Sequence, residues 1–240
     1  MLATTIGTCQ VCGVLDAASS PNRPCASVAT VLPLAQRVVE MRKQEVRQRI
    51  LSDRPGSDGH PLMFAAQAWN YMYPLGDPPN YHPEKDQNVA ERARREGRDP
   101  LDVIYDDLLV DEGKAVLYRP SANREGDRFE NVGSIVLNHP DCLLGLGDGG
   151  AHYGMICDAG LPTYFLLHWV GHKEDAKRVP LPRAIKMLAH DTAQAIGMWD
   201  RGQIAPGLKA DINIIDMHRL HLHAPYPVRD LPAGGRRLVQ

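Results

Sequence analysis

Between about residues 60 and 200, stretches with the pattern of strands alternate with stretches with the pattern of helices, and this alternation limits the fold more than any other feature. The apolar run AVLYRP at residues 115–120 predicts a short buried strand, and FENVGSIVLNHP at residues 129–140 predicts a helix that stops before Pro140. A second apolar run then leads into a glycine-rich loop, CLLGLGDGGAHYG. Strands and helices that alternate in this way usually build a parallel sheet with helices across its faces. The sequence therefore predicts an α/β fold made of parallel βα units.

Helical spacing of apolar residues predicts five further helices. They cover residues 33–51, 86–95, 99–110, 161–172 and 181–197. Asp99 can cap the third of them, and Gly97 and Gly197 stand where glycine commonly ends a helix. In the first helix the apolar stripe slips by one residue between Met41 and Val46. Basic residues in that helix are interleaved with glutamates, so we interpret them as a solvated face; they are Arg42, Lys43, Arg47 and Arg49.

Residues 52–85 contain six prolines, which exclude a long helix there. This stretch predicts one short strand at residues 62–69 (LMFAAQAW), followed by a rigid excursion. Long structured excursions inside compact domains are usually functional. Beyond residue 199 the pattern changes to strand and turn, with a Pro206-Gly207 turn before the alternating run INIID at residues 212–216.

Composition and charge exclude several classes of protein. The chain of 240 residues has 29 acidic and 27 basic side chains, for a formal net charge of −2. A nucleic-acid-binding domain would normally carry a basic surplus, and no apolar run reaches the roughly 18–20 residues of a membrane span. The first residues lack a secretory signal, and the five cysteines are an odd number. We therefore expect a cytoplasmic protein without a disulfide framework.

Asp148 is the residue most suited to carry chemistry, because it follows an apolar run and precedes Gly149 and Gly150. In barrel and doubly wound α/β folds, sites are built at the carboxyl ends of strands. A carboxylate there can ligate a metal ion, accept a proton from a metal-bound water, or do both. An aspartate beside glycine also commonly bonds to loop amides, so the local sequence leaves a structural role open. His152 could face the same pocket or could be a surface or packing residue.

Three histidines near the C-terminus, His218, His221 and His223, have spacing that resembles a metal site. In a strand, His221 and His223 would share a face, as metal ligands often do. They lie beyond the last predicted helix, close to two prolines and with Asp216 as the nearby carboxylate. We therefore interpret them as part of a solvated edge strand and expect them to bind no metal.

Several segments together resemble the C-terminal half of the amidohydrolase superfamily. They are LGLGDGGAHYGMICDAGLPTYFLLHW, LPRAIKMLAHDTAQAIGMWDRGQIAPGLKADINIIDM and RDLPAGGRRLVQ. The branch that they resemble most is that of the D-aminoacylases (N-acyl-D-amino-acid deacylases), and PLGDPPNY, GRDPLDVIYDDLL and LPLAQRVVEMR are similar to that branch too. The resemblance covers roughly residues 30–240, and the run DRGQIAPGLKADINIID is its most specific part.

The resemblance implies a fold, a reaction and a set of site residues. The fold would be the C-terminal part of a distorted (β/α)8 TIM-like barrel over residues 1–200, with 1–30 poorly defined, followed by the start of a small β domain at 201–240. The reaction would be hydrolysis of the amide bond of an N-acyl-D-amino acid, or of a related C–N bond, by a zinc-activated water. By position, Asp148 matches the aspartate that contacts the metal site and acts as general base, and Gly149, Gly150 and His152 match a loop near the substrate.

The chain has no counterpart of the family's His-x-His after the first strand, nor of its later histidine ligands. We therefore expect a fragment of a longer enzyme that is inactive as this chain alone. The alternatives are a non-catalytic binding or assembly protein that keeps a truncated amidohydrolase fold, and an enzyme whose remaining ligands come from a separate N-terminal polypeptide. We expect a small-molecule substrate, no nucleic acid and no membrane, with a missing N-terminal half or a second copy of the chain as partner.

Overall fold

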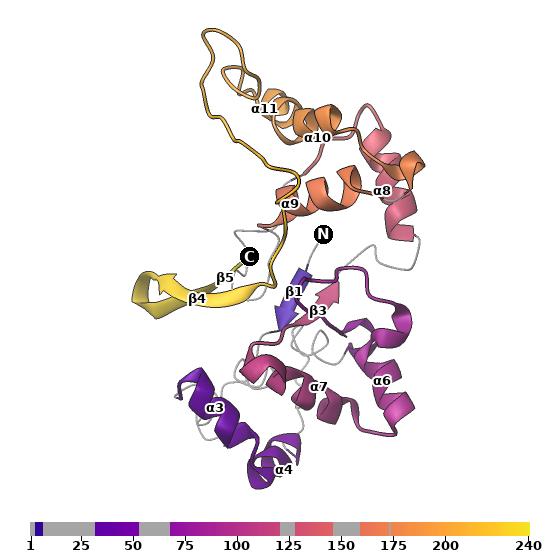
Figure 1. Ribbon diagram of the computed structural model, residues 1–240, viewed down its shortest axis with the longest axis vertical. Helices are drawn as coiled ribbons and strands as arrows, with labels where there is room; N and C mark the ends of the chain where they lie inside the picture. Colours follow the sequence, from indigo (N-terminus) through magenta and orange to yellow (C-terminus); the bar gives the residue numbers. More distant parts are fainter. Residues whose placement is uncertain (1–2, 7–31, 53–67, 121–127, 146–158, 173) are drawn as a thin grey trace.

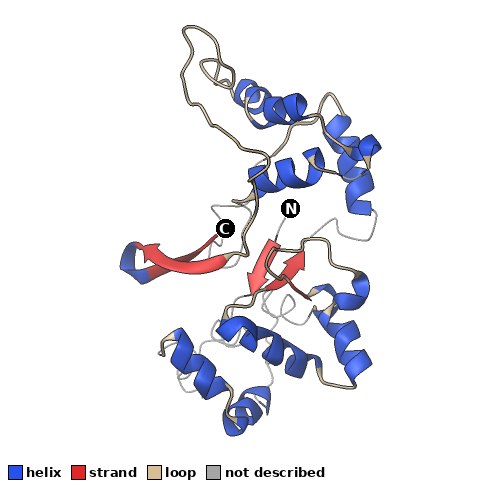
Figure 2. Cartoon of the chain, viewed as in Figure 1, coloured by secondary structure: helices blue, strands red, loops and turns tan. Residues whose placement is uncertain are grey.

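The computed structural model describes residues 3–6, 32–52, 68–120, 128–145, 159–172 and 174–240. Its helices form two groups, with a small sheet between them and a strand hairpin at one side (Figure 1). Within these ranges, short helices and long connections make up most of the chain, and strands are few (Figure 2). A search of the described helices finds none with the length and apolar character needed to cross a bilayer.

The predicted helix at residues 33–51 is two helices, α3 (Leu34–Met41) and α4 (Gln44–Ser52). The break explains the one-residue slip in the apolar stripe. Met41 and Val46 are five positions apart, which in one continuous helix would separate them by about 140° around the axis. Because the chain breaks at Arg42 and Lys43, the apolar side of each helix can face the core. Val38 and Met41 of α3 and Val46 and Ile50 of α4 are all buried.

Helices α6 (Val89–Glu96) and α7 (Pro100–Leu109) are an antiparallel pair whose ends follow from local sequence. The Asn88 side chain accepts a hydrogen bond from the Glu91 amide, and Asp99 caps α7 by accepting from the Leu101 amide. Gly97 has φ +62°, the left-handed conformation that ends a helix most easily at glycine. The pair encloses an apolar cluster made of Met72, Val89, Ala93, Val103, Ile104, Leu108 and Leu117. The 3-10 turns η2 (Lys85–Gln87) and η3 (Val110–Gly113) flank it.

The central sheet has the strand order β1-β3-β2, with β1 (Ala3–Ile6), β2 (Tyr73–Pro74) and β3 (Leu117–Pro120). Both pairs are antiparallel, and Tyr73 pairs with Tyr118. The prediction of a strand at 115–120 is confirmed, but the prediction of parallel βα units is wrong for the strands that the structure describes. Two antiparallel helices, and not one, connect β2 to β3, so the chain returns to the sheet in the opposite direction. The described residues therefore do not form a barrel.

Two other predicted strands are not formed where the structure describes them. Residues 62–67 lie outside the described ranges, and Trp69–Tyr71 at the end of the predicted strand forms a 3-10 turn, η1. Cys142–Gly145, the described start of the apolar run before Asp148, has no regular structure, and the Leu143 side chain is 54% exposed. A short apolar run has the same sequence pattern in a strand and in an irregular segment whose alternate side chains pack on a core, so the pattern alone does not predict which of the two forms.

The second group of helices contains α8 (Arg128–Asn138) and α9 (Leu161–Phe165), which continues as the π-helix η4 (Leu166–Val170). These helices confirm the predictions at residues 129–140 and 161–172. Gly133 lets α8 approach η4 closely, because a Cβ atom at this position would lie 2.6 Å from the Trp169 ring. The cluster that joins the group consists of Leu137, Phe165, Leu166, Trp169, Val179, Ala184 and Met187.

The predicted helix at residues 181–197 is also two helices, α10 (Leu181–Leu188) and α11 (His190–Ala195). They follow the 3-10 turn η5 (Asp175–Lys177). Ala189 between them has φ −122° and ψ −70°, which interrupts the helix. The Thr192 hydroxyl donates to the carbonyl oxygens of Leu188 and Ala189 at this interruption.

The C-terminal part contains an antiparallel hairpin of β4 (Tyr226–Leu231) and β5 (Gly235–Val239), joined by the turn η6 (Pro232–Gly234). The Pro206-Gly207 turn is confirmed, since the Leu208 amide donates to Ala205 O across it. The strand predicted at residues 212–216 is not formed, and Ile214 is 98% exposed. Alternation predicts a strand only where a partner strand is present, and no described residue pairs with this run. A domain border at residue 200 stays a prediction.

Candidate functional site

The residues that the sequence assigns to the site lie outside the described part of the chain. Asp148, Gly149, Gly150 and His152 all belong to residues 146–158. The roles of Asp148 as general base and metal ligand, and of the other three residues near the substrate, therefore stay predictions.

The described residues on either side of this segment lie on two apolar clusters that meet at α9. Leu144, just before the segment, packs against the cluster that includes Phe165 and Trp169. Just after it, Gly160 approaches Leu222 and Gln240 so closely that a Cβ atom would lie 2.5 Å from the Gln240 amide oxygen. The described residues just before and just after residues 146–158 therefore both lie near α9, which begins at Leu161.

Four aromatic side chains pack against one another at one side of α9 and η4. The histidine–tyrosine cluster consists of His82, Tyr164, His168 and His172. The ring of His82 is nearly parallel to that of His168, with centroids 4.4 Å apart and an interplanar angle of 13°. Nε2 of His82 lies 2.5 Å from the Tyr164 hydroxyl oxygen. His172 is buried and stacks on Trp169, with ring centroids 6.1 Å apart.

Two elements position the cluster. Tyr164 and His168 are four residues apart on one face of the helix formed by α9 and η4, and His172 follows just after the end of that helix. His82 comes from the proline-rich excursion, where its amide donates to the Asn80 side chain. The neighbouring Tyr81 is held edge-on against Tyr118 of β3 and against Tyr164. The excursion is therefore fixed against both the sheet and α9.

The cluster combines a phenol and an imidazole at hydrogen-bonding distance, an arrangement that can pass a proton between two side chains. The Glu174 amide donates to Nδ1 of His172, so the proton of a neutral His172 ring resides on Nε2. The site residues predicted from the sequence include none of His82, His168 and His172. The four-residue spacing that starts at Tyr164 could have indicated His168 and His172. No pattern in the neighbouring sequence indicates that His82 contacts them.

The described side chains do not assemble a metal site of the expected kind. In the described ranges no group of three or more histidine, cysteine, aspartate or glutamate side chains converges so as to hold an ion. A hydrolytic zinc site normally needs three protein ligands and an open position. The described residues therefore do not fit such a site by themselves.

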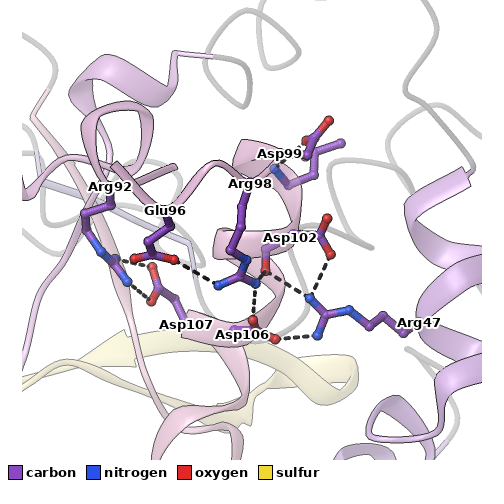
Figure 3. A network of polar contacts seen from close by, with 9 residues as sticks. Arg47, Arg92, Glu96, Arg98, Asp99, Asp102, Asp106 and Asp107 are labelled. Atoms are coloured by element: carbon purple, nitrogen blue, oxygen red, sulfur yellow. Dashed lines mark hydrogen bonds and ion pairs between the residues drawn. The ribbon is translucent and has the colours of Figure 1, made fainter. Parts of the chain in front are cut away.

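A network of ion pairs links α4, α6 and α7 (Figure 3). Arg47 of α4 forms ion pairs with Asp102, at 2.7 Å, and with Asp106 of α7, and its guanidinium carbon lies 4.9 Å from the centre of the Tyr105 ring. Arg98 also binds Asp106, while Arg92 of α6 holds Asp107 with two hydrogen bonds of 2.7 and 2.8 Å. The prediction that Arg47 belongs to a solvated face is thus wrong, because its side chain is only 23% exposed.

The pKa values in the network follow from these contacts. Burial by itself raises the pKa of Asp106, but hydrogen bonds from Arg47 and Arg98 outweigh it and bring that pKa below its ordinary value. The hydrogen bond with Asp106 raises the pKa of Arg47, and the hydrogen bonds with Asp107 raise the pKa of Arg92. Asp106, Arg47 and Arg92 are therefore charged at neutral pH, and their ion pairs join the three helices.

Two curated proteins are similar to parts of this chain. "Adenine deaminase 2" from Latilactobacillus sakei is 36% identical over 94 residues, which are 37% of this chain and 16% of that protein. "5-methylthioadenosine/S-adenosylhomocysteine deaminase" from Acetivibrio thermocellus is 27% identical over 125 residues, 51% of this chain and 28% of that protein. The chain thus spans less than a third of the length of either relative. No solved structure matches it.

The sequence profile of the amidohydrolase family matches residues 27–231, which is most of the chain. The matched range includes the glycine-rich segment around Asp148 as well as every member of the histidine–tyrosine cluster. The chain belongs to the amidohydrolase family.

Proposed function

We propose that the chain supplies the Asp148-containing part of a hydrolase that cleaves C–N bonds, with N-acyl-D-amino acids as the substrate class. The observation that carries this proposal is the family match over residues 27–231. The substrate class rests on the segments around Asp148 and at residues 181–217, which resemble the D-aminoacylase branch.

In the proposed reaction Asp148 accepts a proton from the attacking water while the water oxygen adds to the amide carbonyl carbon. The C–N bond then breaks, and Asp148 returns the proton to the departing nitrogen. The products are a carboxylic acid and a free amine, so one water is consumed and Asp148 ends in its starting form. Gly149 and Gly150 would let the substrate approach the backbone closely, and His152 would lie beside it. Zinc remains a prediction for the longer enzyme.

A second candidate is a deaminase, and the names of both curated relatives favour it. The same general base would serve there, but the bond broken would be the one between a ring carbon and an exocyclic amino group, and ammonia would leave. The two candidates share Asp148 and differ in the substrate and in the nitrogen product.

A chimera tests the proposal, since the chain covers only part of its relatives. Residues 27–231 would replace the matching segment of a longer amidohydrolase that carries the His-x-His motif. The purified chimera would be assayed for amine release from N-acetyl-D- and N-acetyl-L-amino acids, and for ammonia release from adenine and adenosine derivatives. The matched variants are Asp148→Asn and Asp141→Asn, the latter being an exposed aspartate seven positions earlier.

We expect hydrolysis of the N-acetyl-D-amino acids that depends on Asp148 and not on Asp141. Ammonia release from the purines with no amide hydrolysis would replace the proposal by the deaminase candidate. A folded chimera that hydrolyses neither class would favour a non-catalytic binding or assembly protein.

A further inference from the structure

The imidazole rings of His221 and His223 converge on one point at the protein surface. Their Nε2 atoms lie 2.9 Å apart, and the ring centroids are 4.4 Å apart with an interplanar angle of 85°. Both side chains are exposed. The two ring nitrogens therefore form a hydrogen bond with each other at a place where an ion from solution can reach both.

The backbone fixes the proton on one of these rings. Nδ1 of His221 lies 2.7 Å from the carbonyl oxygen of Arg219. A carbonyl oxygen only accepts hydrogen bonds, so Nδ1 must be the donor, and Nε2 of the neutral ring then carries a lone pair. Histidines that bind metals commonly show this arrangement, in which the second ring nitrogen donates to a carbonyl or carboxylate.

The two ring nitrogens share a hydrogen bond of 2.9 Å, so one ring donates and the other accepts. An ion that replaces the shared proton would be bound by two imidazole nitrogens. Imidazole is a ligand that suits divalent transition metals, and in their usual order of affinity Ni²⁺ and Cu²⁺ bind such nitrogen ligands most tightly.

Neighbouring contacts hold the two histidines in place. Leu222, between them, packs on an apolar cluster that includes Tyr81, Tyr118 and Tyr164. The Ala224 amide donates to Asp77, and Pro225 is fully buried. Leu222 is half-buried, whereas the side chains of His221 and His223 on either side of it are exposed. Little conformational entropy is lost on binding an ion, because the two rings are already close together.

We propose that His221 and His223 form a two-histidine chelate for a divalent transition-metal ion of the Cu²⁺ or Ni²⁺ type. Two protein ligands leave the remaining coordination positions to water, so the ion exchanges with solution. The sequence analysis expects no metal here because it assigns these residues to an edge strand. That strand is absent from these described residues, and the Arg219 carbonyl and the Leu222 contact bring the rings together instead. The proposal does not rest on the proposed hydrolytic function.

Calorimetric titration of the 240-residue chain with Ni²⁺, which thiols do not reduce, tests the chelate. The variants are His221→Gln and His223→Gln, with His218→Gln as the matched control, because His218 is a neighbouring exposed histidine outside the converging pair. Loss of a metal ligand should weaken binding more than loss of a hydrogen bond to a ligand does, so each of the first two variants should lower the affinity at this site by at least about tenfold. His218→Gln should bind as the unaltered chain does. Equal affinity in all four proteins, or weakening in His218→Gln alone, would overturn the proposal.

A second measurement needs no substitution in the protein that is tested. In the unaltered chain labelled with ¹⁵N-histidine, paramagnetic Ni²⁺ added below one equivalent should broaden two imidazole signals before the others, and the variants identify which signals these are. Broadening that is spread evenly over all histidines would contradict the chelate even if a variant failed to fold, and broadening that begins at signals other than those of His221 and His223 would contradict it too. Mg²⁺ at the same concentration should change nothing, because it prefers oxygen ligands.

Discussion

The hydroxyl oxygen of Tyr164 lies 2.5 Å from Nε2 of His82. This hydrogen bond fastens the proline-rich excursion to the helix that begins directly after the glycine-rich segment. It therefore joins the proline-rich excursion to α9 across 82 positions of the sequence.

Replacing Tyr164 by Phe should remove this hydrogen bond while the ring keeps its stacking contacts. Because a hydrogen bond of this kind contributes about 0.5–1.5 kcal/mol, the free energy of unfolding should fall by about 1 kcal/mol in urea denaturation. Tyr226→Phe is the control, since Tyr226 is 55% exposed and its substitution should change stability by less than about 0.5 kcal/mol. Equal effects of the two substitutions would show that the Tyr164 hydroxyl contributes nothing specific.

Asp106→Asn should lower stability at neutral pH and have less effect in acid. The hydrogen bonds from Arg47 and Arg98 hold the pKa of Asp106 below its ordinary value of 3.8. Its carboxylate thus stabilises the fold above about pH 4, and this contribution is lost as the pH falls through the lowered pKa of the folded state. Asp106 is 44% exposed, so solvent screening limits the expected loss at pH 7 to about 0.5–1 kcal/mol.

Urea denaturation at pH 7 and at pH 3 measures this difference, with Asp141→Asn as an exposed control. If the difference in the free energy of unfolding between the unaltered chain and Asp106→Asn were as large at pH 3 as at pH 7, the charge of Asp106 would not be the cause.

Gly97→Ala should destabilise the chain through backbone strain alone. Gly97 has φ +62°, and a Cβ atom there would meet no other atom within 4 Å. The left-handed conformation costs about 1–2 kcal/mol for residues other than glycine, and thermal unfolding should detect a loss of that size. Gly145 is the control, because its surroundings are equally open and its φ does not lie in the left-handed range. Should Gly145→Ala prove as costly, strain at Gly97 would not be the explanation.

In the chimera described above, Asp148→Asn should reduce turnover by about 10²–10⁴, the usual contribution of a positioned general base. The melting temperature should change little, because the substitution is nearly isosteric. Steady-state kinetics with the preferred N-acyl substrate measures the effect. Unchanged turnover would remove Asp148 from the mechanism.

Features determined by a few neighbouring residues could be predicted from the sequence. The cap at Asp99, the helix end at Gly97 and the Pro206-Gly207 turn all depend on contacts within a few positions. The one-residue slip in the apolar stripe between Met41 and Val46 is also visible in the sequence. Only the structure shows that it marks a break between two helices.

Features that depend on distant partners could not be predicted. The antiparallel pairing of Tyr73 with Tyr118 follows from two helices in the connection, and the alternating run at residues 212–216 finds no partner among the described strands. At the candidate site, the spacing of Tyr164, His168 and His172 was readable in the sequence. The approach of His82 was not, because the excursion that carries it folds back through contacts with Tyr118.

The exposed run at residues 212–216 has a consequence for the lifetime of the chain. Proteases bind their substrates as extended backbone with free amide and carbonyl groups, and residues 210–215 form no backbone hydrogen bond with other described residues. A protease of broad specificity can therefore reach the backbone around Ile214, whose side chain is 98% exposed. A partner that covered this run would slow cleavage within residues 210–215, so the rate of nicking there reports on whether the run is covered.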